Sequence, residues 1–230
     1  MMIRAVLFDL GNTLVSYYLR TDFPSILRAS LSACASSLGF NGDQEDLFER
    51  AWRLNVETVD HAVHPLAERL HELLGQGGTV DEHNLDVACD AFLQPIFALG
   101  KLDAEAPAVL DSLRKRGIKT AIVSNTPWGS PAAAWREELV RLGLFDRVDA
   151  TVFCMDVGFR KPHAAPFRRA LDLLSVAPAE AMFVGDEPQW DVIGARDAGL
   201  RPVLFASSPS GVGNGCLTIG RLTDVLDLVP

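Results

Sequence analysis

Cysteine is scarce in this chain, and the few cysteines that occur stand far apart. No Cys-x-x-Cys pair is found among the four, which are Cys34, Cys89, Cys154 and Cys216. Zinc sites need such short spacing, and a disulfide framework needs a denser set. The sequence therefore predicts neither, and we expect reduced thiols that lie mostly in the core.

A long apolar segment is also absent. A membrane span needs about 18 or more apolar residues in a row, whereas Arg4 and Asp9 bracket the N-terminal apolar run and no cleavage-like signal follows it. Basic residues are in the minority, because 21 Lys and Arg stand against 30 Asp and Glu, a formal net charge of −9. We therefore expect a cytoplasmic protein that spans no membrane and binds no nucleic acid.

What the chain does have is the composition of an ordinary globular protein, with 48% hydrophobic and 22% charged residues over 230 positions. That length suffices to bury a substantial core. Strand and helix patterns alternate in its second half. Strands are expected at 119–123, 150–153, 181–184 and 202–205, and helices at 107–116, 132–142, 164–174 and 190–198. Such alternation predicts an α/β fold with a doubly wound parallel sheet.

Between the first strand and Lys101 the pattern is helical only. One helix is expected to end at Gly39, a second to carry Leu47 and Trp52, a third to run from Pro65 to Leu74, and a fourth to carry Leu85 and Phe92. We therefore expect an α/β core formed by residues 1–15 and 97–230, with residues 16–96 inserted as a helical part.

Asp9 is the most informative residue of the chain. It directly follows the apolar run Ala5–Phe8 and opens a turn that contains Gly11. In an open α/β sheet, ligands bind at the carboxyl ends of the strands. A carboxylate in that position is therefore a candidate nucleophile or metal ligand, although an aspartate that caps the next helix would look the same.

Polar residues follow three further expected strands in the same manner. They are Ser124 with Asn125, then Lys161, and then Asp186 with Asp191. Each alone has an ordinary explanation, such as a helix cap or a solvated loop charge. Their repeated position after apolar runs instead indicates one site that is assembled from distant segments.

Taken in order, these segments resemble the four motifs of the haloacid dehalogenase-like hydrolase superfamily. Residues 9–13 (DLGNT) correspond to motif I, Ser124 to motif II, Lys161 to motif III, and Asp186 with Asp191 to motif IV. The resemblance extends over nearly the whole chain. It implies a Rossmann-like core, a helical cap of the C1 type inserted after motif I, and a hydrolase of the phosphatase branch.

The resemblance also implies a metal site. Asp9 and Asp186 would be ligands of Mg²⁺, together with the main-chain carbonyl of Gly11, and Asp9 would be the nucleophile. The chemistry agrees, since Mg²⁺ prefers one or two carboxylates together with water and phosphate oxygens. The expected reaction is hydrolysis of a small phosphomonoester, such as a sugar phosphate or a similar metabolite, through an aspartyl-phosphate.

The remaining motif residues would hold the phosphate. Ser124 and Lys161 are expected to be catalytic and to bind substrate, because a hydroxyl and an ammonium stabilise the negative charge of a transferring phosphoryl group. Asn125 is expected to join them in binding substrate. The resemblance gives Asp191 the task of orienting Lys161 rather than of contacting the metal.

One departure bears on function. Most phosphatases of the superfamily carry a second aspartate two residues after the nucleophile, as general acid and base, whereas this chain has Gly11 there and Asn12 next. Loss of such a group costs about 10²- to 10⁴-fold in rate. Branches with an Asp-x-Gly-Asn loop nevertheless resemble sugar-phosphate phosphatases, with Glu187 or a water as the candidate for proton transfer.

Two alternatives remain open. A 2-haloacid dehalogenase needs no acid at Gly11 and could use Arg20 for a carboxylate, although metal-independent dehalogenases usually carry a Ser-Asn segment in place of Asp186. A catalytically impaired phosphate-binding protein would also explain Gly11. Phosphonate cleavage by a cap lysine is excluded, because no lysine precedes Lys101.

Histidines and aromatic residues of the helical part allow more than one interpretation. A metal cluster is less favoured than surface or substrate-contact roles for His61, His64, His71 and His83. Pocket lining and packing explain the remaining residues equally well, namely Tyr17, Tyr18, Arg20 and Phe23 after motif I and Trp128 after Ser124.

Overall fold

A six-stranded parallel sheet forms the centre of the molecule. The computed structural model describes residues 2–40, 42–55, 60–74, 82–206 and 216–230. The strand order is β5-β4-β1-β6-β7-β8. The strands are β1 (Ala5–Phe8), β4 (Lys119–Ser124), β5 (Ala150–Phe153), β6 (Ala181–Gly185), β7 (Arg201–Phe205) and β8 (Leu217–Ile219). This confirms the expected doubly wound α/β fold, to which β8 is an addition.

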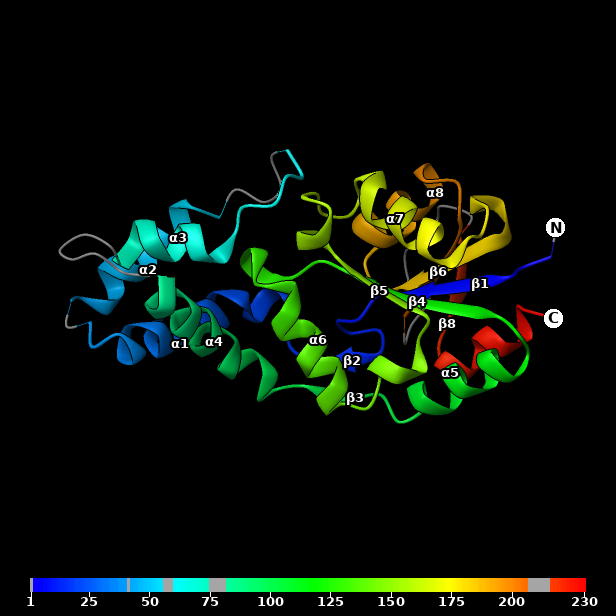
Figure 1. Cartoon of the computed structure of the whole chain (residues 1–230), viewed down its shortest axis with the longest axis horizontal. Coiled ribbons are helices and arrows are strands. Elements are labelled where there is room, and N and C mark those ends of the chain that lie inside the picture. The colour runs from blue at the N-terminus through cyan, green and yellow to red at the C-terminus, as the bar shows by residue number, and fades with distance from the viewer. Residues whose placement is uncertain (1, 41, 56–59, 75–81, 207–215) are drawn as a thin grey trace.

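Strand β1 is apolar throughout because both of its faces are covered. Ala5 and Leu7 pack in one hydrophobic cluster with Phe167 of α7 (Ala164–Leu174). Val6 and Phe8 point to the opposite face and pack in the other cluster, which includes residues of α5 (Ala106–Lys115) and α6 (Ala132–Arg141). Figure 1 shows α7 on one side of the sheet and α5 on the other. A strand buried on both faces has no polar alternation.

The segment expected as a helix at 190–198 has a more specific shape. It begins with a π-helical turn, Pro188–Ile193, and only then continues as α8 (Gly194–Asp197). In that turn the main-chain N–H of Glu187 donates to the carboxylate of Asp191 at 3.0 Å. Turns of this type often occur at functional sites, and this one directs Asp191 inward.

In the described residues between β1 and β3, four α-helices build the helical part. They are α1 (Phe23–Ser37), α2 (Gln44–Arg53), α3 (Leu66–Leu74) and α4 (Glu82–Phe97). They gather at the end of the molecule opposite both chain termini (Figure 1). The chain leaves and re-enters the core through an antiparallel pair, β2 (Val15–Ser16) and β3 (Lys101–Leu102). Helix α4 ends at Phe97, one residue beyond residue 96, where the helical part was expected to end.

The helical part also contacts the core in its middle. Main-chain hydrogen bonds join Val63 to Gly158 at 2.9 Å and Arg160 to His61 at 2.8 Å. Trp128 is fully buried and stacks on Phe92 of α4 at 5.8 Å between ring centres. Packing is therefore the role of Trp128.

The described cysteines are all free thiols, three of them buried, as expected from their spacing. Residues 207–215, which are rich in Ser and Gly and would form a surface loop by that composition, lie outside the described residues. Within the described ranges, no helix is both long and apolar enough to cross a membrane.

Candidate active site

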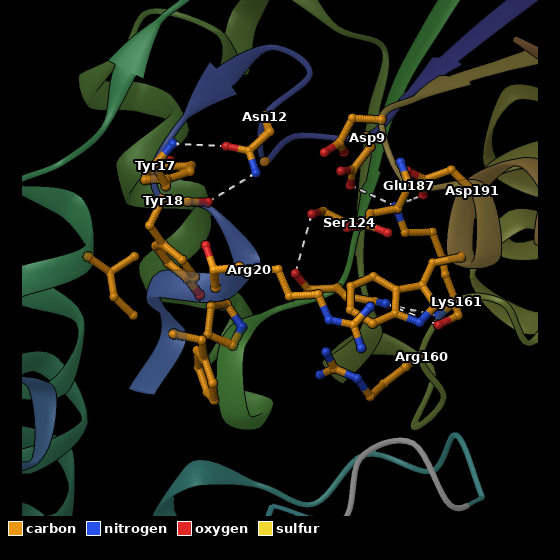
Figure 2. A pocket seen from close by; sticks show the side chains of 18 of the residues that line it. Asp9, Asn12, Tyr17, Tyr18, Arg20, Ser124, Arg160, Lys161, Glu187 and Asp191 are labelled. Carbon is orange, nitrogen blue, oxygen red and sulfur yellow. Dashed lines mark hydrogen bonds and ion pairs between the residues drawn. The ribbon is translucent and has the colours of Figure 1, made fainter. Parts of the chain in front are cut away.

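The predicted site residues meet at the carboxyl ends of three adjacent strands. Asp9 follows β1, Ser124 ends β4 and Asp186 follows β6. Because β1 lies between the other two in the sheet, these side chains are brought together although they are far apart in the sequence. Figure 2 shows how Asp9, Ser124 and Lys161 converge on one pocket.

Lys161 reaches this point from the loop between β5 and α7. Its Nζ donates to Oδ1 of Asp9 and to Oδ1 of Asp191, each at 2.7 Å. Burial disfavours the charge of the ammonium, but the two carboxylates outweigh burial and raise the pKa of Lys161. The side chain is therefore a cation at neutral pH.

Asp191 holds Lys161 in this position. Its Oδ1 accepts from Lys161 and its Oδ2 accepts from the main chain of Glu187. A side chain at Gly185 would collide with the carboxylate of Asp191, so glycine is needed for this close approach. Both oxygens of Asp191 are thus engaged inside the protein.

A second brace acts on the main chain of Lys161. The amide of Asn125 donates to the carbonyl of Lys161 at 3.1 Å and accepts from its N–H at 2.8 Å. The neighbouring Arg160 donates from its guanidinium to the carbonyl of Thr126 at 2.7 Å. Asn125 lines the pocket as expected, but its amide serves the lysine loop. Arg160 could not be recognised from the sequence, where its only signal is its place beside Lys161.

Three carboxylates crowd together beside the lysine. Oxygens of Asp9, Asp186 and Asp191 all lie within 4.8 Å of one another, and among the described residues this is the only such group of His, Cys, Asp or Glu. None of the described histidines therefore belongs to a cluster of this kind. The surplus of acid is the dominant electrostatic feature of the site.

This crowding changes the acidity of two carboxyl groups. Burial, followed by the charges of Asp9, Asp191 and Glu187, raises the pKa of Asp186 to about 8. Burial also raises the pKa of Asp191, to about 6, against the opposing effect of Lys161. A bound cation would relieve this repulsion, and a set of carboxylate oxygens is the donor chemistry that Mg²⁺ prefers.

The pocket has a volume of about 500 Å³, within the range of small-molecule sites. All predicted site residues line it, namely Asp9, Gly11, Ser124, Asn125, Lys161, Asp186 and Asp191. Residues of the helical part, such as Tyr18 and Phe23, also line the pocket. Further lining residues that sequence reasoning did not assign to the site are Asn55, Trp52, Trp135, Arg160 and Trp190.

The family of the chain follows from its similarity to known proteins. The family model of the haloacid dehalogenase-like hydrolases matches residues 3–199. The chain belongs to this family. The expected family, fold and hydrolase class are thereby confirmed.

Two curated relatives of this hydrolase are named as phosphatases. The chain is 33% identical over 211 residues to a phosphoserine phosphatase of Thermus thermophilus, with 87% of the chain and 80% of the relative covered. It is 29% identical over 250 residues to a ribulose-1,5-bisphosphate 5-phosphatase of Halopiger xanaduensis, with coverage of 98% and 100%.

A solved structure shows the same fold. A 2-haloacid dehalogenase from Pseudomonas syringae superposes with a TM-score of 0.73 at 23% identity, covering 99% of the chain and 98% of that structure.

The backbone of the motif I loop favours asparagine at position 12. The φ of Asn12 is 55°, in the left-handed region, where asparagine is tolerated better than most residues. Its amide donates to the carbonyl of Tyr18 at 3.1 Å and accepts from the N–H of Tyr17 at 3.3 Å. Asn12 therefore supports the chain where it leaves the core for the helical part.

Proposed function

We propose that this hydrolase is a phosphatase that removes phosphate from small phosphomonoesters, with a divalent cation such as Mg²⁺ and with Asp9 as nucleophile. The observation that carries the proposal is the convergence of three carboxylates within 4.8 Å, beside an ammonium 2.7 Å from Asp9. The phosphatase names of the relatives support the same reaction class.

Asp9 has the geometry of a nucleophile. Its Oδ1 accepts from Lys161, while its Oδ2 has no hydrogen bond to any residue that the structure describes. That oxygen would attack phosphorus in line, so that the Asp9–phosphorus bond forms while the bond to the leaving oxygen breaks. Water then releases inorganic phosphate from Asp9.

Asp9 and Asp186 would hold the cation, with the carbonyl of Gly11 as a third candidate ligand. The cation would supply positive charge to the phosphoryl oxygens in the transition state. Lys161 supplies a second positive charge and the Ser124 hydroxyl a hydrogen-bond donor, both within the same pocket. Asp191 and Asn125 keep Lys161 in place.

Protonation of the leaving group is the weak step of this site, because Gly11 offers no acid. Glu187 lines the pocket and, with water, is the candidate proton donor. Esters with good leaving groups should therefore react fastest, and hydrolysis of the aspartyl-phosphate should be slow.

We further propose that residues 16–96 form a cap that selects the substrate over a core of residues 1–15 and 97–230. Support comes from the pocket wall, to which the helical part contributes Tyr18, Phe23 and Trp52.

The decisive experiment is phosphate release from p-nitrophenyl phosphate with and without Mg²⁺. We expect activity that needs Mg²⁺ and is lost in Asp9→Asn, while Asp172→Asn, an isosteric change of an exposed acid on α7, leaves it intact. A readout without turnover is the melting temperature, which Mg²⁺ should raise in the wild type but not in Asp186→Asn.

The dehalogenase alternative is tested in parallel. Gly11 suits it, but the carboxylate of Asp186 beside Asp9 favours a cation-dependent reaction. Metal-independent halide release from a 2-haloacid, with no phosphate release, would replace the phosphatase proposal. Phosphate binding without turnover in either assay would favour a binding protein.

A further inference from the structure

Aromatic side chains are concentrated around the pocket. The chain contains only 2 tyrosines and 4 tryptophans, and most of them line this one cavity. The aromatic lining residues are Tyr17, Tyr18, Phe23, Trp52, Trp135 and Trp190. Such enrichment reflects either packing or recognition of a ligand.

Packing accounts for three of these rings. Trp135 is buried and meets Tyr17 edge to face at 5.6 Å between ring centres, an arrangement typical of aromatic cores. Trp190 has the guanidinium of Arg20 over its ring, 5.0 Å from the centre. This cation–π contact covers one face of Trp190.

The other three rings form a continuous surface, which we call the aromatic wall and define as Tyr18, Phe23 and Trp52. Tyr18 and Phe23 are stacked with centres 6.3 Å apart and planes at 28°. Phe23 and Trp52 follow at 6.5 Å and 40°. All three lie in the helical part and line the same pocket as the carboxylates.

Trp52 is packed only in part. Its ring stacks on Phe48 of the same helix, with ring centres 5.8 Å apart and planes at 29°. It lies in the last turn of α2, whose buried residues are Leu47, Phe48 and Ala51. Trp52 itself is 43% exposed, although it lines the pocket. The part of the ring that stays exposed offers apolar surface to a ligand in the pocket.

We propose that the substrate is a phosphomonoester whose alcohol carries a flat aromatic or heteroaromatic ring, which stacks on the aromatic wall. This rests on the proposed phosphatase function and narrows its substrate class. Flat π systems stack favourably on aromatic side chains, and a cavity of about 500 Å³ has room for a ring beyond the phosphate. An ester of a short aliphatic alcohol would leave the wall in water.

The test compares esters that differ only in the ring. Adenosine 5′-monophosphate and ribose 5-phosphate share the same primary ester, and benzyl phosphate is matched by cyclohexylmethyl phosphate. We expect kcat/KM to favour the aromatic member of each pair by about 10-fold, equal to about 1.4 kcal/mol. Phosphate release is measured with Mg²⁺ present.

Variants of the wall connect the preference to the structure. Trp52→Leu should remove most of it by lowering kcat/KM more for the aromatic member of each pair than for its aliphatic partner, whereas Trp52→Phe should retain the preference because a ring remains. Phe145→Leu is the matched control, since Phe145 is an exposed aromatic residue outside the pocket lining.

The outcomes separate this inference from the function on which it rests. No phosphate release from any ester, including p-nitrophenyl phosphate, would overturn both. Release without preference for the aromatic members would overturn the aromatic wall alone. An equal loss for all esters in Trp52→Leu would also overturn it, because the tryptophan would then be needed only for folding.

Discussion

Gly11 stands two residues after Asp9, at the position where most phosphatases of the superfamily carry a general acid and base. A side-chain carbon built on Gly11 meets no atom within 4 Å, and its φ lies outside the left-handed region. The backbone therefore permits a larger residue there. The absence of an acid is a property of the sequence, which the surrounding structure does not require.

We expect Gly11→Asp to raise kcat for alkyl phosphates about 10²-fold, because a general acid and base contributes at least that much. Aryl phosphates should gain less, since their leaving groups need no proton. With an aryl phosphate, rapid-quench kinetics should show a burst of the phenol in the wild type, because hydrolysis of the aspartyl-phosphate is slow, and a smaller burst in the variant. Gly11→Asn, which has the same shape without the acid, is the control. An equal gain in both variants would refute the role of the proton.

Asn125 acts on Lys161 through the main chain, so its removal should affect the chemical step. We expect Asn125→Ala to lower kcat by up to about 30-fold with little change in KM, since two hydrogen bonds of about 1 kcal/mol each are lost. Asn55→Ala, which alters another asparagine of the pocket lining, provides the comparison. A rise in KM with unchanged kcat would instead identify Asn125 as a substrate contact.

At the scale of elements, Glu105 joins the start of α5 to the C-terminal helical segment Leu222–Asp227. Its carboxylate accepts from Arg221 Nε at 2.9 Å and from both the N–H and the hydroxyl of Thr223 at 3.1 Å. The hydrogen bond from Arg221 is the largest cause that lowers the pKa of Glu105. The ionised form is thus favoured in the folded protein.

A pH dependence follows for this contact. Because the pKa of Glu105 is lowered on folding, its stabilising effect is complete above the ordinary value of 4.5 and is lost as pH falls through the native pKa. Glu105→Gln should lower the melting temperature at pH 7, and the difference from wild type should shrink below about pH 4.5. Glu49→Gln, an exposed acid of α2, should change little. A difference that is constant with pH would contradict the ionic contribution.

For the whole molecule, the close approach of the core to the helical part depends on Gly129. Its φ is +64°, and a side chain there would collide with the main-chain carbonyl of His64. Beside it, Trp128 stacks on Phe92 and hydrogen bonds link segment 61–63 to 158–160. Segment 158–160 directly precedes Lys161, so the position of the helical part and that of the lysine loop are connected.

Gly129→Ala should therefore lower both stability and activity. We expect a loss of about 1–3 kcal/mol in the free energy of unfolding, from overpacking in addition to backbone strain, and a fall in kcat/KM. Gly117→Ala isolates the strain, because Gly117 has a φ of +72° with no atom near the added carbon. Denaturant titration measures the loss in the free energy of unfolding for each variant. Equal losses in Gly129→Ala and Gly117→Ala would contradict this account.

The alternating strands and helices, the run of helices after β1 and the polar residues at the strand ends could all be predicted from the sequence, because burial on a sheet and ligand binding at strand ends leave local patterns. The roles of those polar residues remain predictions. The sequence also determined that Gly11 cannot donate a proton. These features are properties of single residues or short segments, so periodicity and motif order suffice to find them.

Other features depend on contacts between distant segments and had to come from the three-dimensional structure. They include the bracing of the Lys161 main chain by the Asn125 amide, the π-helical turn that directs Asp191 inward, and the place of Trp52 in the pocket lining. An asparagine or tryptophan has the same local pattern whether it packs, braces or binds. The choice is made by which neighbours the fold brings within a few ångströms.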